Sequence, residues 1–313
     1  MENTKQITNT ILMVRPARFG YNEETAANNA FQKNDERLSE EKIAQLAIEE
    51  FDALVTQLRA IGVEVIVVKD TNDPLTPDAV FPNNWISFHE NGTLITYPMF
   101  SSIRRKERRI DLVEELSKRF YIDHRIELEG HEIENRFLEG TGSLILDRPN
   151  KVLYACLSPR TEEQLTKELA AKLGYRAIIF TAKDDEGQEI YHTNVMMALG
   201  EDFAVICLDT ITDILERQDV IEALEETDKE IIEISLEQMM QFAGNMLQVE
   251  GKDGASYLVM SKAAYDSLDE EQIATIKEHT TILSSAIPTI ETYGGGSVRC
   301  MMAEVFLPPK QQR

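Results

Sequence analysis

The sequence predicts an α/β protein assembled from similar strand-strand-helix-strand units. Segments with apolar residues at the helical period alternate with short β-branched runs, and pairs of apolar runs separated by polar turns lie between them. The unit recurs about five times along the 313 residues, and no linker rich in proline, glycine or serine interrupts it. Each unit has an apolar face that it cannot bury alone. We therefore expect a single domain that covers residues 1–313.

The first unit shows the pattern most clearly. Residues 11–14 form a short apolar run that predicts a buried strand. A long helix is predicted to begin near Ser39, with apolar residues at helical spacing, and Gly62 suits its C-terminal cap. The β-branched run 63–68 then predicts the next strand.

The later units repeat this order, with local signals at most element ends. A serine with a glutamine three residues later predicts the helix that starts at Ser235, and polar turn residues separate the paired strands. We predict hairpins at 84–88 with 93–97 and at 142–146 with 151–156, helices at 110–120, 158–174 and 261–268, and strands at 177–180, 192–199, 256–260 and 301–307.

Composition narrows the classes of function. The chain is 42% hydrophobic and 28% charged, and its formal net charge of -23 disfavours binding to nucleic acid or to an anionic membrane. The N-terminal residues lack a signal-peptide pattern, and no run of about 18 apolar residues occurs. The three widely spaced cysteines fit neither a disulfide framework nor a zinc site, and the five histidines lack metal-ligand spacing. We expect a cytoplasmic protein with a small-molecule site and no metal.

Residues 294–302 contain the first candidate for chemistry. The three consecutive glycines from Gly294 to Gly296 disfavour regular structure, so they indicate a sharp bend or a close approach of the backbone. Cys300 follows at the predicted start of the last strand, where its thiol would be an exposed nucleophile. A small buried hydrophobe is the alternative, and this stretch alone leaves both interpretations open.

A cysteine nucleophile needs an acid or base nearby and a third group to orient it. His192 opens a predicted apolar strand at a loop boundary, whereas the other four histidines have polar or charged neighbours. A hydrogen-bonded histidine at a strand end is the alternative. Glu139 precedes a Gly-x-Gly turn that opens a predicted buried strand, which favours it over the many other acids.

The segment 81–85 (Phe-Pro-Asn-Asn-Trp) contains the only tryptophan and two adjacent amides. Asn83 and Asn84 there offer hydrogen-bond donors and acceptors together. An ordinary turn beside a core tryptophan is the alternative.

Five segments in order resemble the guanidino-group-modifying enzymes, and most closely their bacterial citrulline-utilisation branch. The superfamily also includes arginine deiminase, dimethylarginine dimethylaminohydrolase, arginine:glycine amidinotransferase and succinylarginine dihydrolase. The fold implied by this resemblance is a five-bladed α/β propeller (the pentein fold) around a pseudo-fivefold axis, with the site in its central channel. The segments are 81–85, 102–109, 138–142, 192–194 and 294–300.

The resemblance implies roles for individual residues. Cys300 matches the nucleophile, His192 the general acid and base, and Glu139 the first carboxylate of the Glu-Gly-Gly-Asp motif. The implied substrate-binding residues are Phe81, Asn83, Asn84, Asn194, Arg160 and either Arg104 or Arg105, the arginines matching positions that hold a substrate carboxylate.

Three positions depart from the deiminase pattern. Asn84 and Asn194 replace aspartates that clamp the guanidinium in deiminases, and Gly142 replaces the last aspartate of the Glu-Gly-Gly-Asp motif. An amide can donate to a ureido oxygen and accept from a ureido amine, whereas a buried guanidinium needs a carboxylate partner.

We therefore expect a cysteine-dependent hydrolase that cleaves citrulline to ornithine, carbon dioxide and ammonia, with no cofactor. The alternatives are an arginine dihydrolase or deiminase, a dimethylarginine dimethylaminohydrolase, an amidinotransferase, and a non-catalytic binding protein on the same fold. The expected partner is a small amino-acid substrate, and the sequence allows a homo-oligomer.

Overall fold

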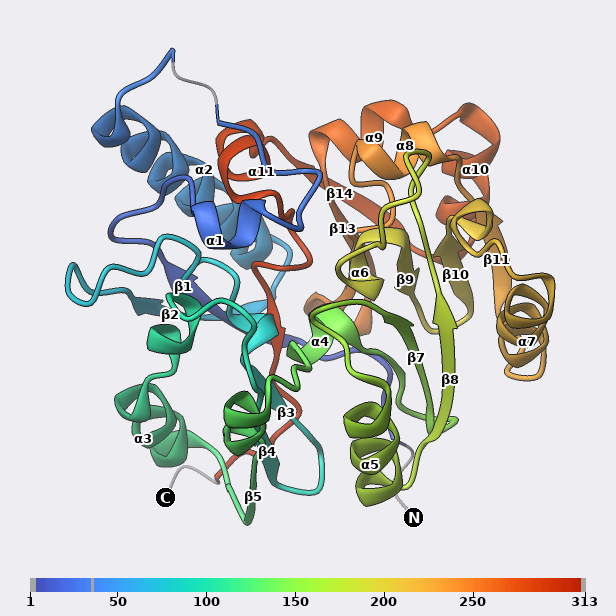
Figure 1. Ribbon diagram of the computed structural model, residues 1–313, viewed down its shortest axis with the longest axis horizontal. Coiled ribbons are helices and arrows are strands. Elements are labelled where there is room, and N and C mark those ends of the chain that lie inside the picture. Colours follow the sequence, from blue (N-terminus) through green and yellow to red (C-terminus); the bar gives the residue numbers. More distant parts are fainter. Residues whose placement is uncertain (1–3, 35–36, 311–313) are drawn as a thin grey trace.

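The computed structural model describes residues 4–34 and 37–310 of the chain. Across this part of the protein, five three-stranded sheets alternate with helices, so the predicted α/β class is confirmed (Figure 1). The strands, grouped by sheet, are β15 (Ala303–Glu304), β1 (Thr10–Arg15) and β2 (Glu64–Lys69); β3 (Ile86–Phe88), β4 (Thr93–Thr96) and β5 (His124–Glu127); β6 (Ile145–Asp147), β7 (Val152–Leu157) and β8 (Arg176–Thr181); β9 (Met197–Leu199), β10 (Phe203–Ile206) and β11 (Glu230–Glu233); β12 (Leu247–Glu250), β13 (Ser256–Ser261) and β14 (Thr281–Ser285).

Every sheet has the same internal pairing. The middle strand pairs antiparallel with the strand before it and parallel with the strand after it, as in β3–β4–β5. The first sheet follows the rule through the C-terminal strand, because β15 pairs antiparallel with β1 at Ile11 and Leu12. The parallel pairs need a helical crossover, which accounts for the strand-strand-helix-strand order along the sequence.

The helices have clear local causes. In α2, Ser39 accepts a hydrogen bond from the backbone N–H of Lys42, and the apolar face that includes Phe51 is fully buried. Gly62 lies beyond α2 with φ +92° and packs against Lys252, so this position needs glycine. The α-helices are α1 (Glu23–Ala26), α2 (Glu40–Ala60), α3 (Ile110–Arg119), α4 (Gly140–Ser143), α5 (Glu163–Leu173), α6 (Thr193–Met196), α7 (Ile214–Glu225), α8 (Leu236–Met240), α9 (Lys262–Ser267), α10 (Glu270–His279) and α11 (Pro288–Gly294), and short 3-10 helices cover Pro82–Asn84, Arg104–Glu107, Glu129–Glu134, Leu208–Thr210 and Lys252–Gly254.

Several predicted boundaries were wrong. The strands expected from 142 and from 192 are preceded by the four-residue helices α4 and α6, so β6 and β9 begin only at Ile145 and Met197. The helix predicted from 158 begins at Glu163, because Ser158 and Thr161 close a turn in which the Thr161 N–H donates to the Ser158 carbonyl.

The strand predicted at 301–307 is limited to Ala303–Glu304. Its apolar residues are buried in two different clusters. Met301 and Met302 pack beside β1 and α2, whereas Val305 and Leu307 pack beside β3 and α3. The apolar character of this segment therefore reflects burial between sheets.

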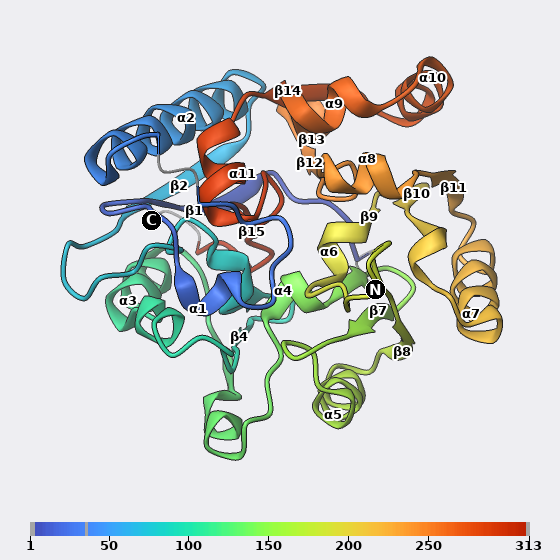
Figure 2. The ribbon, with the colours of Figure 1, turned by 45° about the horizontal axis from the view of Figure 1, so that its top comes forward.

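The arrangement brings the starts of short helices toward the middle of the molecule. The helices α2, α3, α5, α7 and α10 lie at the periphery, whereas α4 and α6 lie further in (Figure 2). Glu139 and His192 stand immediately before α4 and α6. Among the described helices, none is long and apolar enough to cross a membrane.

Candidate active site

Cys300 and His192 lie on the wall of one cavity of about 270 Å³. Glu139 contacts His192 from behind this wall. The three residues come from the segments that precede β15, α6 and α4, so distant parts of the sequence meet here. The cavity is lined by Thr25, Asn29, Asp78, Phe81, Asn84, Arg104, Arg160, Tyr191, His192, Gly294, Gly295, Gly296 and Cys300.

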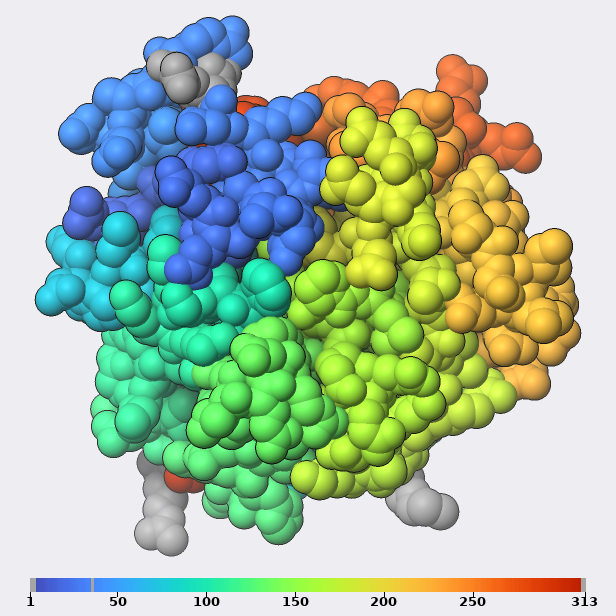
Figure 3. All heavy atoms as spheres, in the orientation of Figure 1, coloured from blue at the N-terminus to red at the C-terminus, as the bar shows by residue number. Residues whose placement is uncertain are grey.

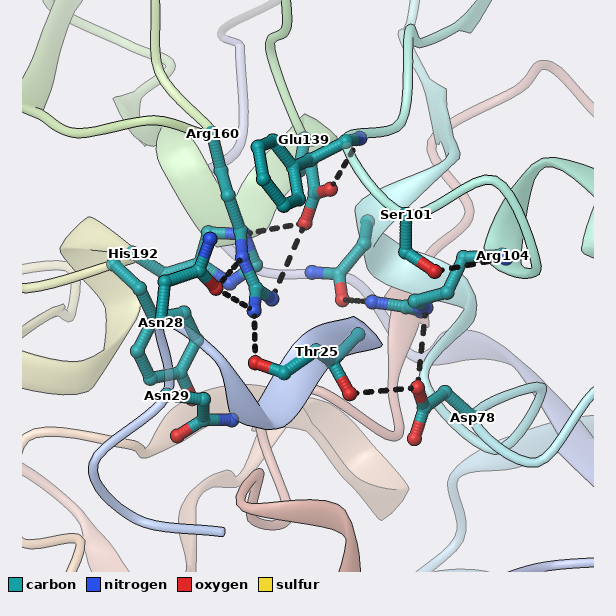
Figure 4. Close-up of polar contacts among 12 residues, drawn as sticks. Thr25, Asn28, Asn29, Asp78, Ser101, Arg104, Glu139, Arg160 and His192 are labelled. Atoms are coloured by element: carbon teal, nitrogen blue, oxygen red, sulfur yellow. Dashed lines mark hydrogen bonds and ion pairs between the residues drawn. The ribbon is translucent and has the colours of Figure 1, made fainter. Parts of the chain in front are cut away.

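Glu139 and His192 form a buried hydrogen-bonded pair. The His192 Nε2 atom lies 2.8 Å from Glu139 Oε2, and each residue is only 1% exposed (Figure 4). Burial lowers the pKa of His192 to about 4 and outweighs the opposing effect of Glu139, so the ring is neutral near pH 7. A neutral ring that donates from Nε2 to Glu139 has Nδ1 as its free acceptor.

Glu139 stays ionised although it is buried. Desolvation raises its pKa, but the Arg160 cation and the hydrogen bond from His192 outweigh it and bring the pKa to about 2. Arg160 Nη1 lies 3.7 Å from Glu139 Oε2, and the Phe100 N–H donates to Glu139 Oε1 at 2.9 Å. The carboxylate therefore orients His192 and can stabilise positive charge on the ring.

Two amides surround the sulfur of Cys300. Asn194 Nδ2 lies 3.4 Å and Asn245 Nδ2 lies 3.3 Å from Cys300 Sγ. Cys300 is only 3% exposed, so of the two interpretations left open by the sequence the thiol is the buried one, and it lines the cavity. In the described structure, Cys300 and His192 share the cavity wall without hydrogen bonding to each other, so a reacting carbon could lie between them.

The orientation of the Asn245 amide is fixed by its other partners. Its Oδ1 accepts from the Arg299 N–H at 3.1 Å, and its Nδ2 donates to the Asn194 carbonyl at 2.7 Å. One N–H of Nδ2 is therefore left to point at Cys300 Sγ. The Asn245 amide thus contacts Cys300 Sγ through Nδ2 at 3.3 Å and through Oδ1 at 3.8 Å, and these contacts hold the sulfur in place.

Sequence reasoning missed Asn245, but a signal for it exists. Each unit places one residue two or three positions before its first strand, and three of these, Asn194, Asn245 and Cys300, contact one another. The other two are neighbours as well, because a Cβ added at Gly142 would lie 2.4 Å from Asn84 Nδ2. Alignment of the five units on their first strands would have singled out Asn245.

Gly142 explains one departure from the deiminase pattern. A Cβ at this position would also lie 2.7 Å from His192 Nδ1, so the histidine ring occupies the space that a side chain would need. An aspartate at position 142 would require His192 or Asn84 to move.

The two candidate asparagines before β3 differ in their surroundings. Asn84 lines the cavity, and its Oδ1 accepts from Arg104 Nη1 at 2.7 Å, while its Nδ2 has no partner among the described residues. Asn83 is buried but does not line the cavity. The structure therefore does not bring Asn83 to the predicted site.

The candidate arginines also separate. Arg104 is held by Glu107 at 2.9 and 3.0 Å and donates to the Phe81 carbonyl at 3.1 Å. Arg160 donates to the Thr25 carbonyl and to Asn28, and both arginines line the cavity (Figure 4).

Arg105 lies outside this cavity. It donates to the carbonyls of Met99 and Phe100 and is placed over the ring of Phe137. The structure therefore separates Arg105 from the site and keeps Arg104.

Asp78 is a cavity carboxylate that sequence reasoning missed. Its Oδ2 accepts from Asn22 Nδ2 at 2.7 Å and lies 3.9 Å from Arg104 Nε, whereas its Oδ1 has no partner among the described residues. It stands in a loop before Phe81, where one acid among many gives no local signal.

The glycine run of 294–296 is explained by close packing. A Cβ at Gly294 would lie 2.8 Å from the ring of Phe81, and Gly295 has φ +61° as it ends α11. Asn29 donates to the Gly295 carbonyl at 3.1 Å, and Tyr191 does so at 2.6 Å. Thr25 and Asn29 therefore place the N-terminal segment against the cavity wall, and Figure 3 shows this segment as the dark-blue atoms in the upper left and centre of the front face.

The other two cysteines are separate from this site. Burial raises the pKa of Cys156 to about 12 and that of Cys207 to about 11. Both thiols are therefore poor nucleophiles at neutral pH. Within residues 4–34 and 37–310, no three His, Cys, Asp or Glu side chains are grouped to hold a metal ion.

Known structures resemble the chain in fold. ArgZ, an arginine dihydrolase from cyanobacteria, aligns with a TM-score of 0.74 and 17% identity over 96% of this chain, which spans only 41% of that protein. The N-terminal domain of ArgZ, bound covalently to a reaction intermediate, aligns over 98% of its own length with a TM-score of 0.73 and 17% identity over 96% of this chain. A dimethylarginine dimethylaminohydrolase variant with an S-methyl-L-thiocitrulline adduct gives 0.65 and 16% identity, over 96% of this chain and 100% of that one.

Family membership follows from a sequence match. No curated protein sequence matches the chain. The family model described as N,N dimethylarginine dimethylhydrolase, eukaryotic, matches residues 15–307, which is nearly the whole chain. The chain therefore belongs to this family.

Proposed function

We propose that the protein hydrolyses the ureido group of citrulline to give ornithine, carbon dioxide and ammonia. We further propose that the five sheets are the blades of a pentein propeller within a single domain. The single observation that carries the substrate proposal is the chemistry around Cys300. The neutral amides Asn194 and Asn245 contact Cys300 Sγ, and Asn84 lines the same cavity. The Glu139 carboxylate already pairs with His192 and Arg160.

The reacting group is recognised by amides. Asn84 Nδ2 and Asn194 Oδ1 are a buried donor and a buried acceptor without partners among the described residues. A ureido group offers an oxygen to the first and an N–H to the second. A guanidinium placed there would be a buried cation without a carboxylate of its own, which is costly.

The amino-acid end of the substrate is recognised by charges. Among the described residues, Arg160 Nη1 has no closer partner than Glu139 at 3.7 Å, so it can take the α-carboxylate. Asp78 Oδ1 can accept from the α-ammonium group. Most N–H groups of Arg104 already donate to Glu107, Asn84 and the Phe81 carbonyl. Arg104 therefore stabilises the cavity wall and leaves the substrate carboxylate to Arg160.

The reaction then proceeds in two steps. The Cys300 thiolate attacks the ureido carbon and forms a C–S bond, His192 takes the thiol proton and gives it to the departing amine, and the C–N bond breaks. Water activated by His192 next attacks the S-carbamoyl carbon and releases the thiolate. The carbamate formed yields carbon dioxide and ammonia, so one water is consumed overall.

A second candidate is arginine dihydrolysis. The fold neighbour ArgZ is named an arginine dihydrolase. In this protein Glu139, beside His192, pairs with Arg160, so a substrate guanidinium that displaces Arg160 would have Glu139 as its carboxylate partner. The family description adds a third candidate, hydrolysis of methylated arginine.

Product analysis separates these functions. Citrulline, arginine and asymmetric dimethylarginine are each incubated with the protein, and ornithine, citrulline, ammonia and dimethylamine are measured. Ornithine and ammonia from citrulline support the proposal. If the protein releases dimethylamine from dimethylarginine and leaves citrulline unchanged, the citrulline proposal is wrong and hydrolysis of methylated arginine takes its place.

A further inference from the structure

A second cavity lies apart from the candidate active site and shares no lining residue with it. It is a partly open hollow at the surface. Its walls come from the β3–β4 turn, the β6–β7 turn, the C-terminal end of α5 at the bottom of Figure 1, and the segment after β15. The lining residues used below are His89, Glu90, Arg148, Lys151, Tyr175 and Phe306.

Arg148 is a buried cation without a hydrogen-bonding carboxylate. The residue is 4% exposed, and its guanidinium lies 3.9 Å from the centroid of the Phe306 ring. Its nearest described carboxylate, Glu304, is 3.9 Å away and already binds Arg299 at 2.8 Å. A buried guanidinium normally has its N–H groups satisfied by oxygen atoms. Arg148 lines both this cavity and the neighbouring one that contains Glu304, and no described residue accepts a hydrogen bond from its guanidinium within normal distance, so its N–H groups are available to a ligand.

Lys151 adds a second cation on the same wall. Its ammonium lies 3.9 Å from Glu90 and 5.0 Å from the ring centroid of Tyr175, and no hydrogen-bond partner lies closer in the described structure. The pKa of His89 is well below its usual value because of burial and because of Arg148 and Lys151, which agrees with a positive local field. The protein as a whole carries a charge of -23, so this local excess is unusual.

The turn that carries both cations is held rigidly. Gln6 accepts from the Arg148 N–H at 2.9 Å and donates to the Leu146 carbonyl at 2.9 Å. Asp147 accepts from Asn150 at 3.0 and 3.2 Å. The positions of the two cations are therefore set before any ligand arrives.

We propose that this cavity is a second binding site, which takes a small organic carboxylate. Arg148 binds the carboxylate with its free N–H groups, Lys151 adds a second positive charge, and the apolar body lies against Phe306 and Tyr175. A planar guanidinium stacked on an aromatic ring is suited to two parallel hydrogen bonds to a carboxylate. The aromatic side chains of Tyr175 and Phe306 favour an organic anion over an inorganic one.

Calorimetric titration with four probes tests the ligand class. Benzoate supplies a carboxylate and an apolar body, acetate supplies the carboxylate alone, benzamide the body alone, and inorganic phosphate a different oxyanion. Benzoate is expected to bind most tightly, acetate more weakly, and benzamide not at all. Phosphate binding alone, or binding of none of the four, would overturn the carboxylate assignment.

Matched variants locate the binding. Arg148→Gln should weaken benzoate binding about tenfold or more, because a charge-assisted hydrogen bond is lost. Lys151 is partly exposed at φ +54°, so Lys151→Asn suits its backbone and provides a second test if Arg148→Gln fails to fold. Arg176→Gln removes an equal charge from an exposed ion pair with Glu226 and should leave binding unchanged.

Equal benzoate affinity in the wild type and in both cavity variants would place the ligand elsewhere and refute the site. This result does not depend on the activity of Cys300.

Discussion

The two ends of the candidate active-site cavity use different chemistry. At one end, Asp78, Arg104 and Arg160 are charged and held by several partners each. At the other end, Cys300 is surrounded by neutral amides, two of which have an unpartnered polar atom among the described residues. The charged end suits the α-amino and α-carboxylate groups that citrulline and arginine share, whereas the neutral end decides which reacting group is accepted.

Loss of the Cys300 sulfur should have the largest effect and abolish nearly all turnover. Cys300→Ser should reduce kcat by at least about 10⁴-fold, because a hydroxyl is a far weaker nucleophile at neutral pH. The fold should persist, since the two side chains are similar in size. Ornithine formation and the Tm are measured, with Cys207→Ser as the control that keeps full activity. Substantial turnover by Cys300→Ser would mean that another group attacks.

Loss of the Asn245 amide, which contacts the Cys300 sulfur, should have the second largest effect on activity. Asn245→Leu keeps the volume but removes the donor to Cys300 Sγ, and kcat/KM should fall about 10²-fold. The rate at which iodoacetamide alkylates Cys300 near pH 7 should fall in parallel, because the amide that positions the sulfur is lost.

Asn83→Leu is the matched control for Asn245→Leu, since Asn83 is equally buried but its amide makes no hydrogen bond to Cys300 or to any other described residue. A stable Asn245→Leu variant with an unchanged alkylation rate would show that this amide only packs.

The charged end should affect binding more than chemistry. Arg160→Lys should raise KM about tenfold with a smaller change in kcat, because bidentate binding of the α-carboxylate is lost. Arg105→Lys, which changes an arginine outside the cavity, should leave KM within about threefold of wild type. An equal effect of both variants on steady-state kinetics would remove the distinction between the two arginines.

Acid should weaken the structure through the His192–Glu139 pair. The folded-state pKa of His192 is lowered from 6.5 to about 4. Its contribution to the free energy of unfolding is therefore complete above pH 6.5 and is lost as the pH falls toward 4. The pKa of Glu139 is lowered from 4.5 to about 2, so its contribution is lost below pH 4.5.

His192→Gln should therefore reduce the loss of unfolding free energy between pH 6.5 and 4.5 by roughly 1–3 kcal/mol. Urea unfolding across this range measures it. An unchanged pH slope would show that His192 is not held neutral.

The sequence was most informative where structure is local. The period of α2 and the hairpin of β3 with β4 depend on neighbours in the chain, and both were predicted close to their observed bounds. The short helices α4 and α6 were missed, because four residues are too few to show a helical period.

The site was predictable only in part. Local patterns singled out Glu139, His192 and Cys300 as candidates, but the family resemblance was needed to join them in one site, since no local pattern brings residues 139 and 300 together. Asn245 and Asp78 escaped notice because their partners are remote: Asn245 and Cys300 are 55 residues apart in sequence. Charge balance and vacant hydrogen-bonding atoms become visible only when the five units are assembled.

The neutral reacting end is tested most directly by kcat/KM for citrulline and for arginine, measured in the wild type and in Asn84→Asp. We predict that the wild type prefers citrulline and that Asn84→Asp shifts the preference toward arginine, because the new carboxylate lies where Asn84 Nδ2 now faces Gly142 and His192. A wild-type preference for arginine of tenfold or more, about 1.4 kcal/mol in the transition state, would contradict the account.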